Sequence, residues 1–223
     1  MKWSNVWNHF KTITEHKLLV MKYCFRVGLY RQGLLHDLSK YSYTEFRTGV
    51  LYYQGNRSPN AAERERFGYS AAWLHHKGRN KHHFEYWIDF SVRGKGLVGN
   101  RMPLCYVIEM TLDRIAASRV YRGNTYSSAA AWEYYQFEKP YIVMHEQTKA
   151  LLEKLLLMLK EEGEAKTFAY MRHLLKRKKR QLMFSAYPAD EDYGHNHGQQ
   201  ADQQITDPHD NADAGAAYAG KPL

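Results

Sequence analysis

The sequence contains few cysteines and no long apolar stretch. Its only thiols among 223 residues are Cys24 and Cys105, each inside an apolar helical pattern, which argues against a disulfide framework and against a thiolate metal site. No apolar run is long enough to cross a bilayer, and the first residues lack the apolar centre of a secretory signal. These absences predict a cytoplasmic protein with no membrane partner.

Charge is distributed unevenly along the chain. Residues 188–223 carry seven acids and one base, so the total charge of +9 leaves about +15 on residues 1–187. Because the acidic segment also lacks apolar periodicity, we predict a helical domain at 1–187 and a disordered acidic tail at 188–223. A basic body favours polyanionic partners such as nucleotides, nucleic acid or anionic surfaces, the alternative being a solvated basic surface without a special partner.

Apolar spacing within residues 1–187 predicts an all-α fold without a convincing strand. Gly28 is expected to end the first helix, Ser42 and Glu45 to form a capping box, and Asn60 to cap a further helix. The helices are expected at about 14–27, at a short segment carrying Leu34, Leu35 and Leu38, and at 43–53, 61–76, 83–87, 103–121, 128–137, 140–162 and 164–181.

A His-Asp dipeptide occurs twice, and its surroundings differ between the two places. His209-Asp210 lies in the polar tail, where we expect it to have no role, whereas His36-Asp37 follows the apolar residues of a short helix. Adjacent side chains cannot both point along one helical face, but they can converge on a cation where a helix ends. Imidazole and carboxylate together suit borderline ions such as Zn, Mn, Fe, Co or Ni.

Further ligand candidates lie on both sides of this pair. His16 lies on the preceding helix, and Asp113 lies inside a later apolar helix, where a buried carboxylate needs a partner. That partner would be a metal or, in the alternative, Arg114 or Arg119. Two histidine pairs, His75-His76 and His82-His83, are also candidates. The remaining histidines are interpreted as non-ligands: His9, His145, His173, His195, His197 and His209.

These segments resemble the HD superfamily of metal-dependent phosphohydrolases and a group of small bacterial and phage proteins of unassigned function. Residues 34–40 are similar to the superfamily's apolar-His-Asp-apolar-Gly/Ser-Lys signature, and residues 112–117 are similar to its closing Asp motif. The resemblance covers about 14–121 and implies an HD-domain-like helical bundle holding one metal or two. The implied ligands are His16, His36, Asp37, one of the His75/His76 pair with His76 favoured, His82, His83 and Asp113.

The same resemblance implies hydrolysis of a small phosphorylated substrate, nucleotides included, with a divalent metal: Mn, Zn, Mg, Co, Ni or Fe. Asp37 and Lys40 are the expected catalytic residues, with Lys40 contacting phosphate beside Arg79 or Lys81. For Glu109 two roles stay open: it orients a ligand imidazole, or it forms a plain salt bridge. Two alternatives stay open: a di-iron oxygenase on the same fold, and a non-catalytic helical module that binds nucleic acid through its basic surface, the run at 176–180 included.

Overall fold

A computed structural model of the chain describes residues 2–55, 57–91 and 96–185. These residues form eight α-helices and one short sheet, which confirms the predicted all-α class. The predicted tail at 188–223 lies outside the described residues. Every helix in the described ranges is too short or too polar to cross a membrane. The elements are α1 (Trp3–Val27), α2 (Tyr30–Leu35), η1 (Leu38–Tyr41), α3 (Tyr43–Leu51), α4 (Pro59–Phe67), α5 (Ala71–Lys77), η2 (Phe84–Trp87), β1 (Ile88–Phe90), β2 (Leu97–Gly99), α6 (Leu104–Arg122), η3 (Gly123–Thr125), α7 (Ala130–Glu138), η4 (Lys139–Tyr141) and α8 (Glu146–Ser185).

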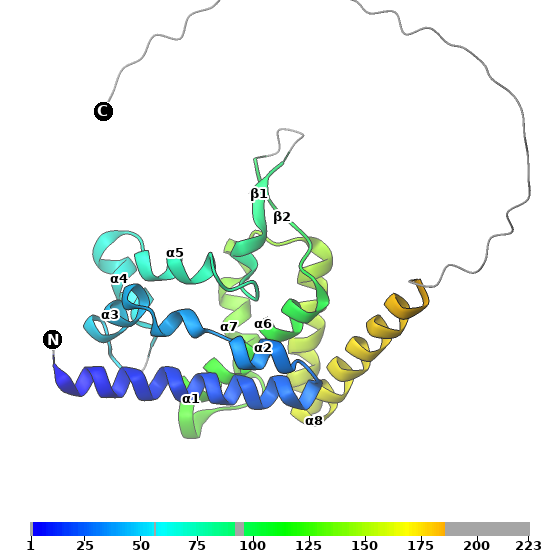
Figure 1. Ribbon diagram of the computed structural model, residues 1–223, viewed down its shortest axis with the longest axis horizontal. Helices are drawn as coiled ribbons and strands as arrows, with labels where there is room; N and C mark the ends of the chain where they lie inside the picture. Colours follow the sequence, from blue (N-terminus) through cyan, green and yellow to red (C-terminus); the bar gives the residue numbers. More distant parts are fainter. Residues whose placement is uncertain (1, 56, 92–95, 186–223) are drawn as a thin grey trace, which may run out of the picture. The chain divides into compact units, whose positions relative to one another are not determined.

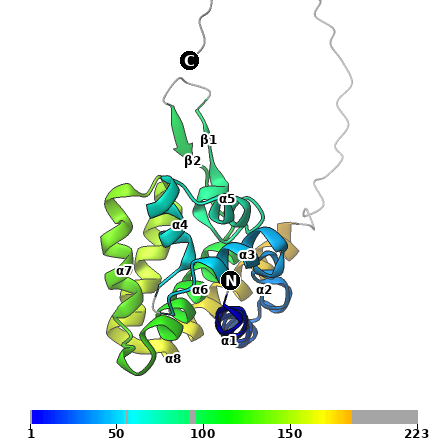
Figure 2. The same ribbon diagram turned by 90° about the vertical axis from the view of Figure 1, so that its left-hand side faces the viewer.

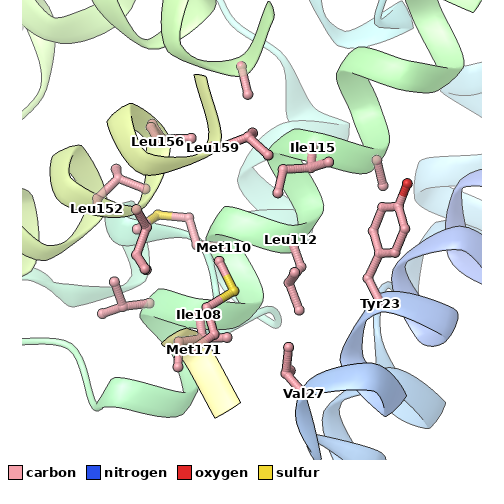
Figure 3. Packing of buried hydrophobic residues seen from close by; sticks show 14 of the residues in the cluster. Tyr23, Val27, Ile108, Met110, Leu112, Ile115, Leu152, Leu156, Leu159 and Met171 are labelled. Atoms are coloured by element: carbon pink, nitrogen blue, oxygen red, sulfur yellow. The ribbon is translucent and has the colours of Figure 1, made fainter. Parts of the chain in front are cut away.

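The core is built around α6, which packs against α1, α7 and α8. Figure 2 shows α6 between the α7–α8 pair and the segment from α1 to α3. A helix surrounded in this way is apolar on most of its faces. Its buried residues Ile108, Leu112 and Ile115 meet side chains of α1 and α8 in one cluster (Figure 3). Glu109 and Asp113 are therefore fixed on a helix with little freedom to move.

The first helix begins earlier than the sequence indicated, at Trp3 instead of Thr14. Its buried face continues toward the N-terminus through Ile13 and His9, which are spaced like the residues of the predicted part. The helix ends at Val27 with Gly28 in the left-handed region, as predicted. It packs against α2 and α6 (Figure 1), so one side of α1 can supply a side chain to both.

The single helix predicted at 61–76 is wrong, because the structure has two helices, α4 and α5. Gly68 ends α4 with φ +80°, a conformation that glycine adopts without steric cost. Ser70 then caps α5 by accepting a hydrogen bond from the Trp73 amide. Asn60 is not the cap of α4, since Ser58 precedes the helix and Pro59 opens it. The break aims the end of α5, with its two histidines, back toward α3.

Three other segments differ from the predictions. Residues 88–90 and 97–99 pair as an antiparallel hairpin that stands away from the helices in Figures 1 and 2; strands of three residues are too short to show alternation. The helix expected from Pro140 begins at Glu146, after the short turn η4. The two predicted helices on either side of Gly163 form α8, with a break in the helical conformation at Gly163 itself (φ +79°, ψ 175°).

Candidate metal centre

The backbone changes direction at His36-Asp37. α2 ends at Leu35, His36 is extended, and Asp37 is left-handed at φ +53°, the one non-glycine residue with positive φ in the described ranges. Such a conformation costs roughly 1–2 kcal/mol in a residue with a side chain. Lys17 of α1 secures the turn, since its Nζ donates to the carbonyl oxygens of Leu34 and His36, both at 2.8 Å. The adjacent His36 and Asp37 side chains therefore enter one common space.

One group of ligand atoms joins α1, the His36-Asp37 turn and α6. Asp113 Oδ1 lies 2.9 Å from His16 Nε2 and 3.4 Å from His36 Nε2. Asp37 Oδ2 lies 3.3 Å from His36 Nε2 and 3.7 Å from His16 Nε2. The ligand atoms of these four residues all lie within 4.8 Å of one another. Three elements far apart in the sequence thus present two imidazoles and two carboxylates to a single point.

A second group uses the other oxygen of the same aspartate. Asp37 Oδ1 lies 3.3 Å from His76 Nε2 and 3.4 Å from His82 Nε2. His83 completes this group, with its Nε2 2.9 Å from that of His76. The residues come from the end of α5 and from the turn that follows it. The structure therefore brings together all seven predicted ligands, as two groups of four that share Asp37.

Buried polar atoms without a well-formed hydrogen bond mark both groups. His36, Asp37, His76 and His82 are each no more than 2% exposed. Within the described residues, five ligand atoms lack a hydrogen bond of good geometry: Nε2 of His16, His36 and His82, and both carboxylate oxygens of Asp37. Their close neighbours are the other candidate ligands and, for Asp37 Oδ2, the ammonium of Lys40 at 2.6 Å. Burying such atoms unpaired is costly, so nearly all buried polar groups in proteins have partners. These side chains could hold metal ions, which would satisfy the five atoms at once.

Two glutamates fix the imidazoles from behind. Glu109 Oε1 lies 3.0 Å from His36 Nδ1 and 3.3 Å from His82 Nδ1, and Glu45 Oε2 lies 2.7 Å from His76 Nδ1. Because an ionised carboxylate only accepts, each Nδ1 must donate, so the lone pair of a neutral imidazole is on Nε2, where an ion could use it. The Nε2 of His76 lies 2.9 Å from that of His83. Of the two roles left open for Glu109, this placement agrees with the orienting one. Glu45 was not predicted for this role, and instead of completing a capping box with Ser42 its side chain contacts His75 and His76.

The pair His75-His76, left open by the sequence, is resolved by the same glutamate. His75 Nδ1 lies 2.6 Å from Glu45 Oε1, and His75 belongs to none of the ligand groups found in the described residues. His76 is buried and faces Asp37. The structure therefore assigns His76 to the candidate metal centre and His75 to its surroundings.

The charged groups around the centre keep the carboxylates of Asp37 and Asp113 ionised. Burial raises the pKa of Asp37, but His36, Lys40 and His76 outweigh it and hold that pKa well below its usual value. Burial likewise lowers the pKa of His36, yet Asp37, Asp113 and Glu109 raise it well above normal. The ionised carboxylates are thus stabilised by a positive charge placed between them. A divalent cation would supply that charge and leave the imidazoles neutral, as ligands must be.

The centre opens onto a cavity of about 620 Å³ whose wall includes His16, His76, His83 and Asp113. Lys40 also lines it, with Nζ 2.6 Å from Asp37 Oδ2. Arg79 and Lys81 are not among the described lining residues. Arg79 donates to the His75 carbonyl, and Lys81 lies over the Tyr86 ring. Of the three predicted phosphate contacts, only Lys40 is therefore placed at the cavity.

Comparison with known proteins gives one family. No curated protein and no solved structure matches the chain significantly. The model of a family of unknown function, DUF5662, matches residues 5–158, a span that includes every residue of both ligand groups. The resemblance to the HD superfamily stays a prediction, because this family has no assigned activity. The match covers well over half of the 223 residues, and the chain is thus a member of the family of unknown function DUF5662.

Proposed function

We propose that this protein is a metal-dependent hydrolase of phosphate esters, of the kind found in the HD superfamily. The observation that carries the proposal is the sharing of Asp37. One of its oxygens faces His16 and His36, and the other faces the histidines of the second group. A carboxylate placed between two sets of candidate ligands, each with buried imidazoles, is suited to serving two cations.

The residues present fit divalent ions of intermediate softness. His16, His36 and Asp113 would hold one ion, His76, His82 and His83 the other, and Asp37 both. Mixed imidazole and carboxylate ligands favour Zn, Mn, Fe, Co or Ni, while Mg prefers sites made of oxygen alone. A divalent cation bound here would polarise a phosphoryl oxygen and acidify a water molecule.

Side chains of the chain itself would bind and orient the ester. Lys40 lies at the junction of the metal centre and the cavity. Burial lowers its pKa, but Asp37 and Asp113 raise it above the usual value, so Lys40 stays cationic at neutral pH. A protonated lysine has no lone pair for an ion and can only donate, which suits a phosphoryl oxygen. The basic body would attract an anionic substrate over a longer range.

Hydrolysis assays with stripped and reloaded protein test the proposal. The protein is freed of metal with a chelator, reloaded with single ions, and assayed on p-nitrophenyl phosphate, bis-p-nitrophenyl phosphate and nucleoside monophosphates. Hydrolysis should require metal and should be lost in Asp37→Ala but not in Asp210→Ala, the matched change in the second His-Asp dipeptide. Activity that survives metal removal, or a metal-loaded protein inactive on every ester, would overturn it.

A further inference from the structure

His9 lines the same cavity but belongs to neither ligand group. It lies on α1 seven residues before His16, and the two face the cavity from the same side of the helix. Seven residues correspond to roughly 10 Å along a helix axis. His9 is therefore placed away from the metal centre, farther along the cavity wall.

The imidazole of His9 is buried without a hydrogen bond. It is 6% exposed, and its contacts are aromatic: the ring centroid lies 5.3 Å from that of Phe46 and 6.1 Å from that of Tyr53. Within the described residues neither ring nitrogen is hydrogen-bonded, although Tyr53 and Thr12 beside it bond to each other. Burying an imidazole without a hydrogen bond costs desolvation free energy, whereas a leucine or phenylalanine would fill the same apolar space without that cost.

Helix α3 carries a glycine, Gly49, where it packs against the His9 imidazole, and this glycine makes the helix less stable. Gly49 lies within α3, where its backbone is helical and a glycine costs roughly 1 kcal/mol relative to alanine. A Cβ atom at this position would lie 1.9 Å from His9 Nε2. Space for the ring, not backbone conformation, thus accounts for the glycine, and Gly49 also lines the cavity. Two positions on different helices are therefore matched to keep an unpartnered imidazole in this wall.

His9 is a neutral hydrogen-bonding group at physiological pH. Burial, and then the charge of Lys40, lower its pKa to about 4. A neutral imidazole offers one donor and one acceptor, unlike the cationic Lys40, which can only donate. It is therefore matched to an uncharged polar group, whereas Lys40 and the metal centre are matched to the phosphate.

We propose that His9 is a specificity-determining residue that hydrogen-bonds an uncharged polar group, such as a hydroxyl or an amide, in the organic part of the ester. The proposal rests on the proposed function, because the metal centre is taken to hold the phosphoryl group. Seven residues of helix then set that polar group roughly 10 Å from the centre, the reach of a sugar phosphate or nucleotide and beyond that of a methyl ester.

Calorimetric titration of the metal-loaded full chain tests this with phosphonates, whose P–C bond is not hydrolysed. Methylphosphonate reports the metal centre alone. The phosphonate analogues of glucose 6-phosphate, adenosine monophosphate and uridine monophosphate add an organic part with hydroxyl or amide groups. At least one should bind more tightly than methylphosphonate. His9→Leu should weaken that ligand about tenfold, the factor for one lost hydrogen bond, and leave methylphosphonate unchanged.

Companion variants separate lost recognition from lost structure. His9→Gln, which keeps a donor and an acceptor, should retain part of the affinity, and Gly49→Ala should weaken the extended phosphonate by displacing the ring. His9→Leu should melt no lower than wild type. The proposal is overturned if His9→Leu binds the extended phosphonates as wild type does, or if none of them binds more tightly than methylphosphonate. Failure of the proposed function would instead show as absent hydrolysis or as methylphosphonate binding that does not depend on metal.

Discussion

Asp37 combines three features that would each be unfavourable in an ordinary residue. Its backbone is left-handed, its carboxylate is 1% exposed, and, apart from the ion pair of Oδ2 with Lys40, its oxygens face only the other candidate ligands. Backbone strain and unpaired buried charge concentrate at functional sites, where the surrounding structure holds them in place. Here the restraint comes from Lys17, which ties the carbonyl oxygens of Leu34 and His36 to α1. The same lysine adjoins His16, so one turn of α1 both supplies a ligand and fixes the turn that supplies two more.

Lys40→Ala should separate substrate binding from metal binding. Removing the ammonium takes away a donor to the phosphoryl group, and we expect kcat/KM to fall by about ten- to a hundredfold. Metal content should not fall, because the variant removes a positive charge 2.6 Å from Asp37 Oδ2 and so cannot weaken a cation there electrostatically. Parallel elemental analysis and kinetics check both parts. A loss of metal in Lys40→Ala would show that the lysine positions Asp37 and does not serve the substrate.

His9 should make stability depend on pH in the acid range. Its folded pKa of about 4 lies below the unfolded value of 6.5, so the unfolded chain binds the extra proton first. The stabilisation is fully present above pH 6.5 and is lost as pH falls from 6.5 toward 4, at up to about 1.4 kcal/mol per pH unit. Urea unfolding of metal-free wild type and His9→Leu between pH 7 and 4.5 measures the difference. Parallel curves for the two proteins would contradict a buried neutral His9.

At the scale of elements, local signals in the sequence predicted more than long-range ones. Gly28 and Gly163 mark breaks that the structure has, and the Ser42 cap is present. Gly68 and Ser70 are an equally local signal for the break between α4 and α5, but the apolar spacing on both sides of them predicts one continuous helix. By contrast, nothing near Glu45 in the sequence indicates its two histidine contacts, which are made 30 and 31 residues away.

The candidate site also divides into features that the sequence predicts and features that depend on long-range packing. The types and approximate spacing of the seven ligands could be predicted because a metal needs particular donor atoms. Their partition into two groups could not, since it depends on how α1, α5 and α6 pack around one turn. His9 was interpreted as a non-ligand, which agrees with the groups, but its place in the cavity wall depends on Gly49, forty residues along the chain. Packing of that kind leaves no local pattern.

The break in α8 gives a prediction about an element. Gly163 has φ +79° and ψ 175°, a region that is essentially restricted to glycine. Nothing in the described structure lies within 4 Å of a Cβ placed there, so strain and not crowding sets the cost of a side chain. Gly163→Ala should lower the free energy of unfolding by about 1–3 kcal/mol, measured by urea denaturation. An unchanged value would mean that the two parts of α8 can join as one straight helix.

At the scale of the whole molecule, the fold places an apolar core and a polar centre on different parts of the same helices. α6 contributes Ile108 and Leu112 to the core, and Glu109 and Asp113 to the centre. α1 likewise contributes Val20 to the core and His16 to the centre. Because the rigid core fixes both helices, the ligands are preorganised before any ion binds. Metal removal should therefore leave helix content unchanged and lower the melting temperature, by linkage. Circular dichroism during chelation tests this, and unfolding on chelation would contradict it.

The central claim is that one aspartate serves two metal ions, and metal stoichiometry tests it most directly. Wild type, Asp37→Ala, Asp113→Ala and Asp210→Ala are loaded with one divalent ion, freed of excess, and analysed for metal per chain. Wild type and Asp210→Ala should hold two ions, Asp113→Ala should lose the ion of the His16–His36 group and retain the other, and Asp37→Ala should lose both. Full metal content in Asp37→Ala, or equal losses in Asp37→Ala and Asp210→Ala, would contradict the account.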